Sequence, residues 1–266
     1  MSVEEKIKEY ERLGLFDKDV EDDPISKGLN PEDIDYLKDG FFDRIKTKIA
    51  NSVAKWYYER EIRRGDFIIK EVKGFHHYQK LSGGVIITCN HFHPYDNYAI
   101  DRTLQPSLGK KRLYKVIKEG NYTSFKGLFG YFFRNCNTLP LSSNLLTMKK
   151  FLKGMEELLK RGEKILVYPE QSMWLNYKKP RPLKPGAFNF AVKNNVPVLP
   201  VFITMEEVVN KKGKKVNAFI LNFLQPIYPD ENLTAKENQV YMAEKNYELW
   251  KETYESFYNK KLVYEE

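Results

Sequence analysis

Two kinds of hydrophobic pattern alternate along this chain, and their order predicts its elements. Short apolar runs rich in β-branched residues are typical of buried strands, and they occupy residues 66–72, 85–89, 110–118, 164–167, 196–203 and 216–223. Apolar residues recur at helical spacing in residues 2–13, 41–64, 94–104, 144–161, 187–194 and 232–260. Strands that alternate with helices favour an α/β fold. We therefore predict a mostly parallel sheet that is flanked by helices.

The pattern also divides the chain into three predicted parts. Residues 14–40 follow neither period and are interrupted at Pro24, Gly28 and Pro31, so we expect them to form an irregular arm. The arm and the helix 41–64 belong to an N-terminal part, residues 1–80. Residues 81–228 form the α/β domain that carries the chemistry, and residues 229–266 form a helical tail that packs on it.

The predicted helix 41–64 combines an apolar stripe with basic flanks. The stripe comprises Phe42, Ile45, Ile49, Val53, Trp56 and Tyr57, and the cations beside it are Arg44, Lys46, Lys48, Lys55, Arg60, Arg63 and Arg64. A basic amphipathic helix of this kind can lie in a membrane interface, with its aromatic rings at the acyl boundary and its cations on lipid phosphates. A helix that packs on the core has the same pattern, and the sequence does not separate the two.

Charge adds a class of partner to this picture. The formal net charge is +8, but residues 1–40 carry 6 basic and 13 acidic side chains, whereas the remaining residues carry 38 and 23. Such a surplus attracts the phosphates of nucleic acid or of an anionic bilayer, unless it is only a solvated basic surface. No aromatic RNA-binding signature and no helix-turn-helix pattern occurs, so we expect no nucleic-acid partner. We expect an anionic membrane surface, contacted by helix 41–64 with help from the basic segments 110–118 and 178–184.

Composition and length limit the setting of the protein. A chain of 266 residues suffices for a substantial core, and 42% hydrophobic with 30% charged residues is the composition of a soluble globular protein. No run of 18 uncharged apolar residues and no signal-peptide pattern occurs, so we expect a cytoplasmic protein that is peripheral on the inner face of the membrane. Cys89 and Cys136 have neither metal-type spacing nor a disulfide framework and are expected to be buried.

The strand 85–89 ends in a polar turn that carries the strongest candidate for chemistry. Asn90 and His91 follow the strand, and Pro94 is suited to the first turn of the next helix, which places Asp96 in that turn. The carboxylate of Asp96 then reaches back to one imidazole nitrogen of His91 and raises the basicity of the other nitrogen. The sequence therefore predicts a dyad that activates a hydroxyl group.

A second strand ends in a similar polar turn, and the two turns together resemble a known family. In order, the segments are Asn90-His91 with Asp96, Pro169-Glu170 after a strand, Lys184-Pro185-Gly186-Ala187-Phe188, and Val196-Pro197-Val198-Leu199-Pro200-Val201. These segments resemble the ordered blocks of the glycerolipid acyltransferases of the lysophosphatidate type. The resemblance runs from about Gly83 to Phe202, which is under half of the chain.

The resemblance implies an α/β fold and transfer of a fatty acyl group from acyl coenzyme A, acyl carrier protein or acyl phosphate to a lysolipid hydroxyl. His91 would be the base that takes the hydroxyl proton, and Asp96 would steady the imidazolium. The default acceptor is 1-acylglycerol-3-phosphate, in phospholipid biosynthesis. Glu170 either holds an acceptor hydroxyl or organises its loop, and Asn90 and Ser172 are further candidates for substrate contact. The acyl donor is a co-substrate, so no resident cofactor is expected.

The chain departs from the family at two positions that usually carry a phosphate-binding arginine. The aligned residue in the second block is Ser142, and Pro169-Glu170 is followed by Gln171-Ser172-Met173 where the family commonly has Gly-Thr-Arg. Lys178, Lys179, Arg181 and Lys184 follow with no acidic residue between 171 and 205. These four are the predicted substitutes as anion binders, Arg181 by its planar fork and the lysines as point charges. The missing arginines also keep a glycolipid or another non-phosphate acceptor open.

Two other functions fit parts of the same pattern. His91, His93 and Asp96 resemble a metal cluster, but the chain has only four histidines and none follows His93, so later strands supply no further histidine ligand. We therefore expect no metal, disfavour a metal-dependent hydrolase, and place His76-His77 at the surface of a turn. A non-catalytic membrane-binding protein would need none of these groups, whereas His91, Asp96 and Glu170 are all present.

Overall fold

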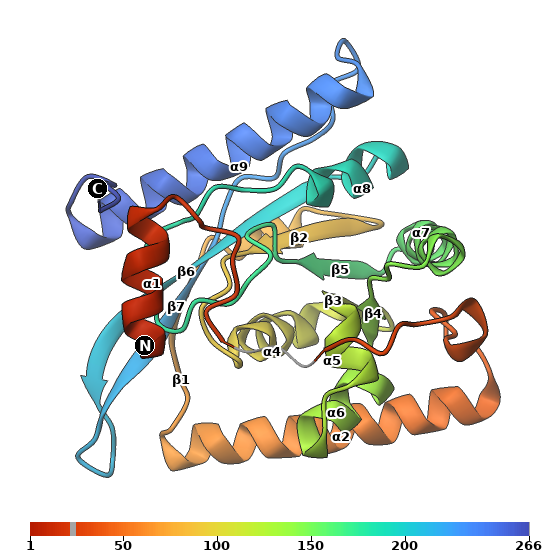
Figure 1. Ribbon diagram of the computed structural model, residues 1–266, viewed down its shortest axis with the longest axis horizontal. Coiled ribbons are helices and arrows are strands. Elements are labelled where there is room, and N and C mark those ends of the chain that lie inside the picture. Colours follow the sequence, from red (N-terminus) through yellow and green to blue (C-terminus); the bar gives the residue numbers. More distant parts are fainter. Residues whose placement is uncertain (22–24, 266) are drawn as a thin grey trace.

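A seven-stranded sheet forms the centre of the molecule in the computed structural model, which describes residues 1–21 and 25–265. In spatial order the strands are β1 (Ile68–Lys73), β7 (Lys215–Phe223), β6 (Val198–Val209), β2 (Val85–Cys89), β5 (Lys164–Val167), β3 (Leu113–Ile117) and β4 (Thr138–Pro140) (Figure 1). Every neighbouring pair in this sheet is parallel except β6 and β7, which form an antiparallel hairpin. The predicted α/β fold with a mostly parallel sheet is confirmed.

Helices cover both faces of this sheet (Figure 1). On one face lie α2 (Phe41–Arg64), α4 (Asp96–Leu108) and α6 (Gly127–Asn135), and on the other lie α7 (Leu145–Lys160), α8 (Gly186–Asn194) and α9 (Ala235–Tyr258). The shorter helical segments are α1 (Val3–Arg12), a 3-10 helix at Pro31–Asp33, α3 (His76–Gln79) and α5 (Glu119–Thr123). None of the described helices is long and apolar enough to cross a bilayer.

Strand β2 shows how the sequence builds the two cores. All of its residues are buried, because side chains alternate between the two faces of a sheet that is covered on both sides. Val85, Ile87 and Cys89 pack with residues of α2 and α4, whereas Ile86 packs with residues of α7 and α8. A strand with no solvent-facing side needs no polar alternation, which explains its continuous apolar run in the sequence.

The first and last predicted parts both contact the sheet of the middle part. β1 lies outside residues 81–228, yet it pairs in parallel with β7 and so belongs to the same sheet. α9 lies in the predicted tail, yet the hydroxyl of Thr88 in β2 donates to the Asn246 side chain of α9 at 2.5 Å, and Met242 of α9 joins the core on that face. The parts that flank residues 81–228 therefore add a strand to the sheet and a helix that covers it.

Most predicted elements are present, and the differences have local causes. α4 begins at Asp96 instead of residue 94, because Pro94 and Tyr95 form the turn before it. β6 extends to Val209, beyond the predicted end at residue 203, because its exposed half is paired with β7. The prediction missed β4, which has only 3 residues and ends at Pro140, and α6, whose two glycines and nearly continuous apolar residues hide a helical period. The break predicted at Pro24 lies outside the described residues.

Candidate active site

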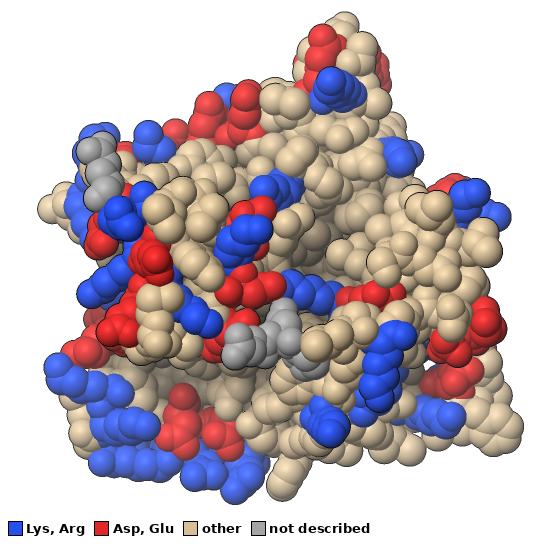
Figure 2. Space-filling model, viewed as in Figure 1, with Lys and Arg blue, Asp and Glu red and all other residues tan. Residues whose placement is uncertain are grey.

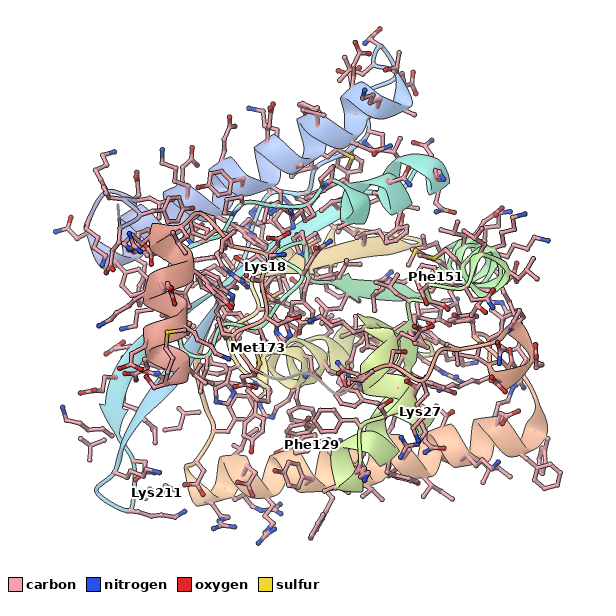
Figure 3. The ribbon with its side chains drawn as sticks, viewed as in Figure 1. Lys18, Lys27, Phe129, Phe151, Met173 and Lys211 are labelled. Carbon is pink, nitrogen blue, oxygen red and sulfur yellow. The ribbon has the colours of Figure 1, made fainter. Side chains whose placement is uncertain are left out.

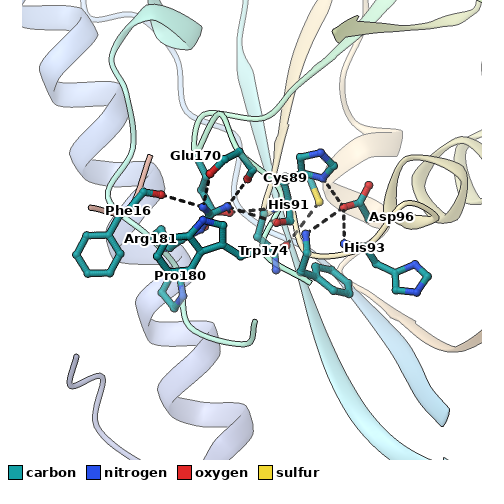
Figure 4. A network of polar contacts seen from close by, with 12 residues as sticks. Phe16, Cys89, His91, His93, Asp96, Glu170, Trp174, Pro180 and Arg181 are labelled. Atoms are coloured by element: carbon teal, nitrogen blue, oxygen red, sulfur yellow. Dashed lines mark hydrogen bonds and ion pairs between the residues drawn. The ribbon is translucent and has the colours of Figure 1, made fainter. Parts of the chain in front are cut away.

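The carboxyl ends of β2 and β5 lie side by side and bring the two predicted motifs together (Figure 4). The strands pair in parallel with Thr88 opposite Val167, so Asn90-His91 and Tyr168-Pro169-Glu170 leave the sheet next to each other. The edge where parallel strands end is the usual place for a ligand site in an open α/β sheet. The structure thus brings the two predicted motifs together at the edge of the sheet where ligand sites usually lie.

The contact predicted between His91 and Asp96 is present. Nδ1 of His91 lies 2.8 Å from Oδ2 of Asp96, and the same oxygen accepts hydrogen bonds from the backbone N–H groups of Phe92 at 3.2 Å and His93 at 3.3 Å. Asp96 is the first residue of α4, where the helix dipole also favours a carboxylate. The Asp96 side chain is fully buried, whereas 22% of the His91 side chain is exposed. Nδ1 is thus occupied by Asp96, and Nε2 is the ring nitrogen left for a substrate.

Tyr168 is part of the same cluster, although the sequence interpretation assigned it no role. Its hydroxyl donates to Oδ1 of Asp96 at 2.6 Å, and its ring stacks on the imidazole of His91 with centroids 4.0 Å apart and an interplanar angle of 19°. Burial, together with the charge of Asp96, raises the pKa of Tyr168 well above its usual value, so the phenol stays protonated and remains a donor. A tyrosine directly after an apolar strand and before Pro169-Glu170 was the available signal.

Glu170 holds the backbone of the turn that carries His91. Oε2 accepts from the backbone N–H of His91 at 2.9 Å, and Oε1 accepts from the backbone N–H of Arg181 at 2.8 Å. The residue is only 2% exposed. Of the two roles predicted for Glu170, these contacts support the organisation of its loop.

Arg181 stands at the centre of a buried network that joins the N-terminal arm to the His91 turn (Figure 4). Its guanidinium pairs with Glu170 at 2.9 Å and is 1% exposed. The same group donates to the hydroxyl of Ser172 at 2.8 Å and to the carbonyls of Phe16 at 2.9 Å, His91 at 3.3 Å and Ser172 at 2.5 Å. Both terminal nitrogens are used within the protein. The predicted role of Arg181 as an anion binder therefore does not agree with this geometry, because the group has no face left for a ligand.

This chain is similar to known proteins in sequence and in fold. A protein-family model described as "Acyltransferase" matches residues 70–204, half of the chain. The chain belongs to the acyltransferase family. The fold is similar to that of the solved structure of the 1-acyl-sn-glycerophosphate acyltransferase PlsC from Thermotoga maritima, with 20% sequence identity, coverage of 83% of this chain and 81% of that chain, and a TM-score of 0.51. A search of curated proteins found no match. The family resemblance inferred from the motifs is confirmed.

The other predicted anion binders of this acyltransferase also make contacts within the protein. The ion pairs and ring contacts are Lys184 with Asp17 at 2.8 Å, Lys179 with Glu11, and Lys178 over the Tyr258 ring at 5.7 Å. Ser172 is 1% exposed and its hydroxyl accepts from Arg181, so it faces the network and not a ligand. The side chain of Lys184 is 45% exposed, and its contact with substrate stays a prediction.

Asn90, a predicted substrate contact, joins two strands of the acyltransferase sheet. Its Nδ2 donates to the carbonyl of Ile203 at 3.0 Å, and its Oδ1 accepts from the N–H of the same residue at 2.8 Å. The residue is 2% exposed. This reciprocal pair extends the β2–β6 ladder past the end of β2 and anchors the turn that carries His91. The geometry thus favours a structural role for Asn90 over contact with substrate.

His93, the second histidine of the turn, makes its hydrogen bond within the protein. Nδ1 of His93 accepts from the backbone N–H of Tyr95 at 3.1 Å, and burial lowers the pKa of His93, which keeps the ring neutral. The rings of His76 and His77 lie 4.1 Å apart near β1, away from the His91 turn in sequence. Within residues 1–21 and 25–265, no group of three or more His, Cys, Asp or Glu side chains is arranged to hold a metal ion.

Proposed function

We propose that this acyltransferase moves a fatty acyl group from a thioester or acyl-phosphate donor to the hydroxyl of a lysophospholipid, with 1-acylglycerol-3-phosphate as the first candidate. The observation that carries the proposal is the 2.8 Å contact of a partly exposed His91 with a buried Asp96 at the carboxyl edge of the sheet. The likeness in fold to a 1-acyl-sn-glycerophosphate acyltransferase supports the same assignment.

In the proposed reaction, Nε2 of His91 takes the proton of the acceptor hydroxyl while the hydroxyl oxygen attacks the donor carbonyl. Asp96 holds the Nδ1–H and stabilises the imidazolium that forms. An ester C–O bond forms, and the C–S bond of a thioester or the C–O bond of an acyl phosphate breaks. The imidazolium proton passes to the departing thiolate, or to solvent when phosphate departs. Because the acceptor attacks directly, no covalent enzyme intermediate is needed.

A non-phosphate acceptor, such as a glycolipid, is the second candidate. Ser142, at the position aligned with a phosphate-binding arginine of the family, donates to the carboxylate of Glu119 at 2.6 Å and to the carbonyl of Leu29 at 3.2 Å. Arg181 is neutralised by Glu170 inside the buried network. A carboxylate repels an acceptor phosphate, whereas it accepts a hydrogen bond from a sugar hydroxyl. These contacts are the reason to keep a neutral, hydroxylated headgroup as the second candidate.

Acyl transfer by the purified protein tests both candidates. Acyl coenzyme A, acyl carrier protein and acyl phosphate that carry the same chain are each offered with lysophosphatidate, neutral lysolipids and lysoglycolipids, and the products are identified by mass. Phosphatidate as the main product supports the first candidate, and an acylated glycolipid without phosphatidate supports the second. A parallel series with EDTA separates acyl transfer from a metal-dependent hydrolase, which would lose its activity. Release of free fatty acid with no acylated acceptor in any combination rejects the proposal.

We propose further that the partner surface is an anionic membrane and that α2 docks on it from the cytoplasmic side. α2 turns Thr47, Ala50, Ala54 and Tyr58 toward the core, whereas five of its large apolar side chains lie in solvent. Their exposed fractions are 72% for Phe41, 75% for Phe42, 42% for Ile45, 53% for Ile49 and 59% for Trp56. α2 runs along one edge of the molecule (Figure 1). Of the two interpretations of this helix, the exposed stripe favours the membrane interface.

Basic side chains near the end of α2 complement this stripe. The β6–β7 hairpin is fixed there, because Asn210 donates to the carbonyl of Gly65, the residue after α2, at 2.9 Å. The exposed cations are Lys211, Lys212 and Lys214 on the hairpin and Arg63 and Arg64 in α2. Figure 3 labels Lys211 beside the end of α2, and Figure 2 shows Lys and Arg gathered at this corner, at lower left. Lys212 and Arg64 pair with Asp66 at 2.8 and 3.3 Å. In the segments 110–118 and 178–184, Lys115, Lys179 and Lys184 are likewise paired with carboxylates, and the contribution of those segments stays a prediction.

Removal of two aromatic side chains from α2 is expected to weaken membrane binding. The parent protein should sediment with phosphatidylglycerol-containing vesicles and be only partly released by high salt. Charge contributes roughly 1 kcal/mol per basic residue within a Debye length of about 8 Å, whereas apolar burial is insensitive to salt. Phe42→Ser with Trp56→Ser should lower the affinity at least tenfold, because each buried aromatic side chain contributes about 1.5–3 kcal/mol. Binding is measured by co-sedimentation at several salt concentrations.

The matched control replaces exposed apolar residues elsewhere. Tyr228 is 56% exposed and Val240, on α9, is 46% exposed, so Tyr228→Ser with Val240→Ser removes exposed apolar surface outside α2. This variant should bind vesicles like the parent. If the α2 variant stays folded and binds as tightly as the control, docking occurs through another surface.

A further inference from the structure

Tyr168 touches both members of the proposed dyad from the end of β5. Its hydroxyl donates to Oδ1 of Asp96 at 2.6 Å, whereas Oδ2 is the oxygen that faces His91. Its ring lies against the imidazole at a centroid distance of 4.0 Å and an angle of 19°. The position of Tyr168 is well fixed, because Val167 before it pairs with Thr88 in the centre of the sheet.

We infer that Tyr168 is a positioning residue for acyl transfer: its hydroxyl fixes Asp96 and moderates the charge that Asp96 presents to His91, and its ring fixes the plane of the imidazole. This inference rests on the proposed function, because it assigns Tyr168 a part in the proton-transfer step. It concerns one side chain that acts through the dyad and does not itself meet the substrate.

The Tyr168 hydroxyl stabilises the negative charge of Asp96. The carboxylate accepts hydrogen bonds from His91, Phe92, His93 and Tyr168, and Tyr168 supplies the one on Oδ1. Each donor stabilises the negative charge of the carboxylate. The attraction between this carboxylate and the imidazolium of His91 is therefore weaker. Without the phenol, Asp96 would attract the imidazolium more strongly, and His91 would hold its proton up to a higher pH. A base that is already protonated cannot accept the proton of an acceptor hydroxyl.

The ring acts on the orientation of His91. A stacked aromatic face restricts rotation of the imidazole and attracts the cation that forms during proton transfer. Phenylalanine keeps this ring and removes the hydroxyl, whereas leucine removes both. The two contributions of Tyr168 can therefore be measured separately.

The other ionisable groups around His91 are unchanged by these substitutions. Apart from Asp96, which the Tyr168 hydroxyl contacts directly, they are Glu170 and Arg181 of the paired network, His93 of the turn and Cys89 of β2. Glu170 and Arg181 contact the backbone of His91 and neutralise each other, and burial lowers the pKa of His93 and keeps it neutral. Burial also raises the pKa of the Cys89 thiol, which stays protonated. A shift caused by Tyr168→Phe therefore reports on its contact with Asp96.

Kinetics and NMR test the inference together. Tyr168→Phe should lower kcat roughly tenfold, with little change in KM, because a tenfold change in rate corresponds to the usual free energy of one hydrogen bond. In the pH profile of kcat/KM, the acidic limb of the Tyr168→Phe variant should move to higher pH by up to about one unit. Tyr168→Leu should lower kcat further. The titration of the His91 ring carbons, assigned by their absence from the spectrum of His91→Ala, should move in the same direction in Tyr168→Phe.

The control and the opposing result are defined by the same measurements. Tyr36→Phe removes a buried phenol that donates to the carbonyl of Pro140 at 2.9 Å, in the core on the other face of the sheet, and it should leave the His91 titration unchanged. An unchanged His91 titration in folded Tyr168→Phe overturns the inference. Since NMR needs no substrate, a parent protein that acylates nothing rejects the proposed function, while the titration still decides the role of Tyr168.

Discussion

Replacement of His91 by alanine is expected to lower the rate of acyl transfer by about two to four orders of magnitude, which is the usual contribution of a general base. The loss should fall on kcat, because the imidazole acts in the transition state and not in substrate binding. The fold should persist, because the main anchors of His91 are backbone groups. Its N–H donates to Glu170 at 2.9 Å, and its carbonyl accepts from the N–H of Trp174 at 3.1 Å. Initial rates at saturating donor and a thermal melt measure both properties.

His76→Ala provides a matched control, since it removes an exposed histidine from the short helix α3, outside the site. Asp96→Asn should also reduce turnover, because the amide cannot hold the Nδ1–H tautomer in the same way. Asp96 accepts four hydrogen bonds, however, so that variant loses stability as well and tests the mechanism less cleanly. Near-normal turnover by folded His91→Ala would remove the base from the mechanism.

Replacement of Arg181 by methionine is expected to lower the free energy of unfolding by about 3–5 kcal/mol, the range seen when one partner of a buried ion pair is removed. Glu170 would remain 2% exposed without its countercharge, and the carbonyls of Phe16 and Ser172 would lose their donors. Urea unfolding followed by circular dichroism gives the change as a lower midpoint at constant slope. Activity should fall too, because the network holds the His91 turn.

Two further variants separate the buried charge from a general loss of contacts. Lys184→Met removes a cation from the same loop, but its pair with Asp17 is exposed, so it should cost only about 0–1 kcal/mol. Adding Glu170→Gln to Arg181→Met removes the unpaired charge and should recover part of the stability. If Arg181→Met is as stable as Lys184→Met, the network does not hold the arm and the loop together.

The dyad could be predicted from the sequence because it is local. His91 and Asp96 are five residues apart, and an apolar strand, a polar turn with Pro94 and a helix start together determine that the carboxylate lies over the turn. Tyr168 and Glu170 reach the same turn from 72 and 79 residues away. Their motif indicated that they lie at the same edge of the sheet, but which atoms meet depends on the register of β2 and β5.

The partners of the basic side chains could not be predicted from the sequence. The basic surplus after residue 40 was visible, but whether a cation is free depends on neighbours far along the chain. Arg181 bonds the carbonyl of Phe16, 165 residues away, and pairs with Glu170 in the interior, so it is unavailable to a phosphate. In α2 the period was correct, but the stripe is divided: Val53 and Tyr57 pack on the core, whereas the other four members face outward. The small residues Ala50 and Ala54 allow the helix to approach the core.

By itself, therefore, the sequence determined the α/β class, the order of most strands and helices, the family and the local pair of His91 and Asp96. Hydrophobic periods, turn residues and short-range spacing determine these features, since each acts within about one element. The tertiary structure alone decided the partner of Arg181, the anchoring of Asn90 to β6, the place of Tyr168 on the dyad and the exposed face of α2. Those features depend on strand register and on burial, which arise only when segments distant in sequence pack together and desolvate their polar groups.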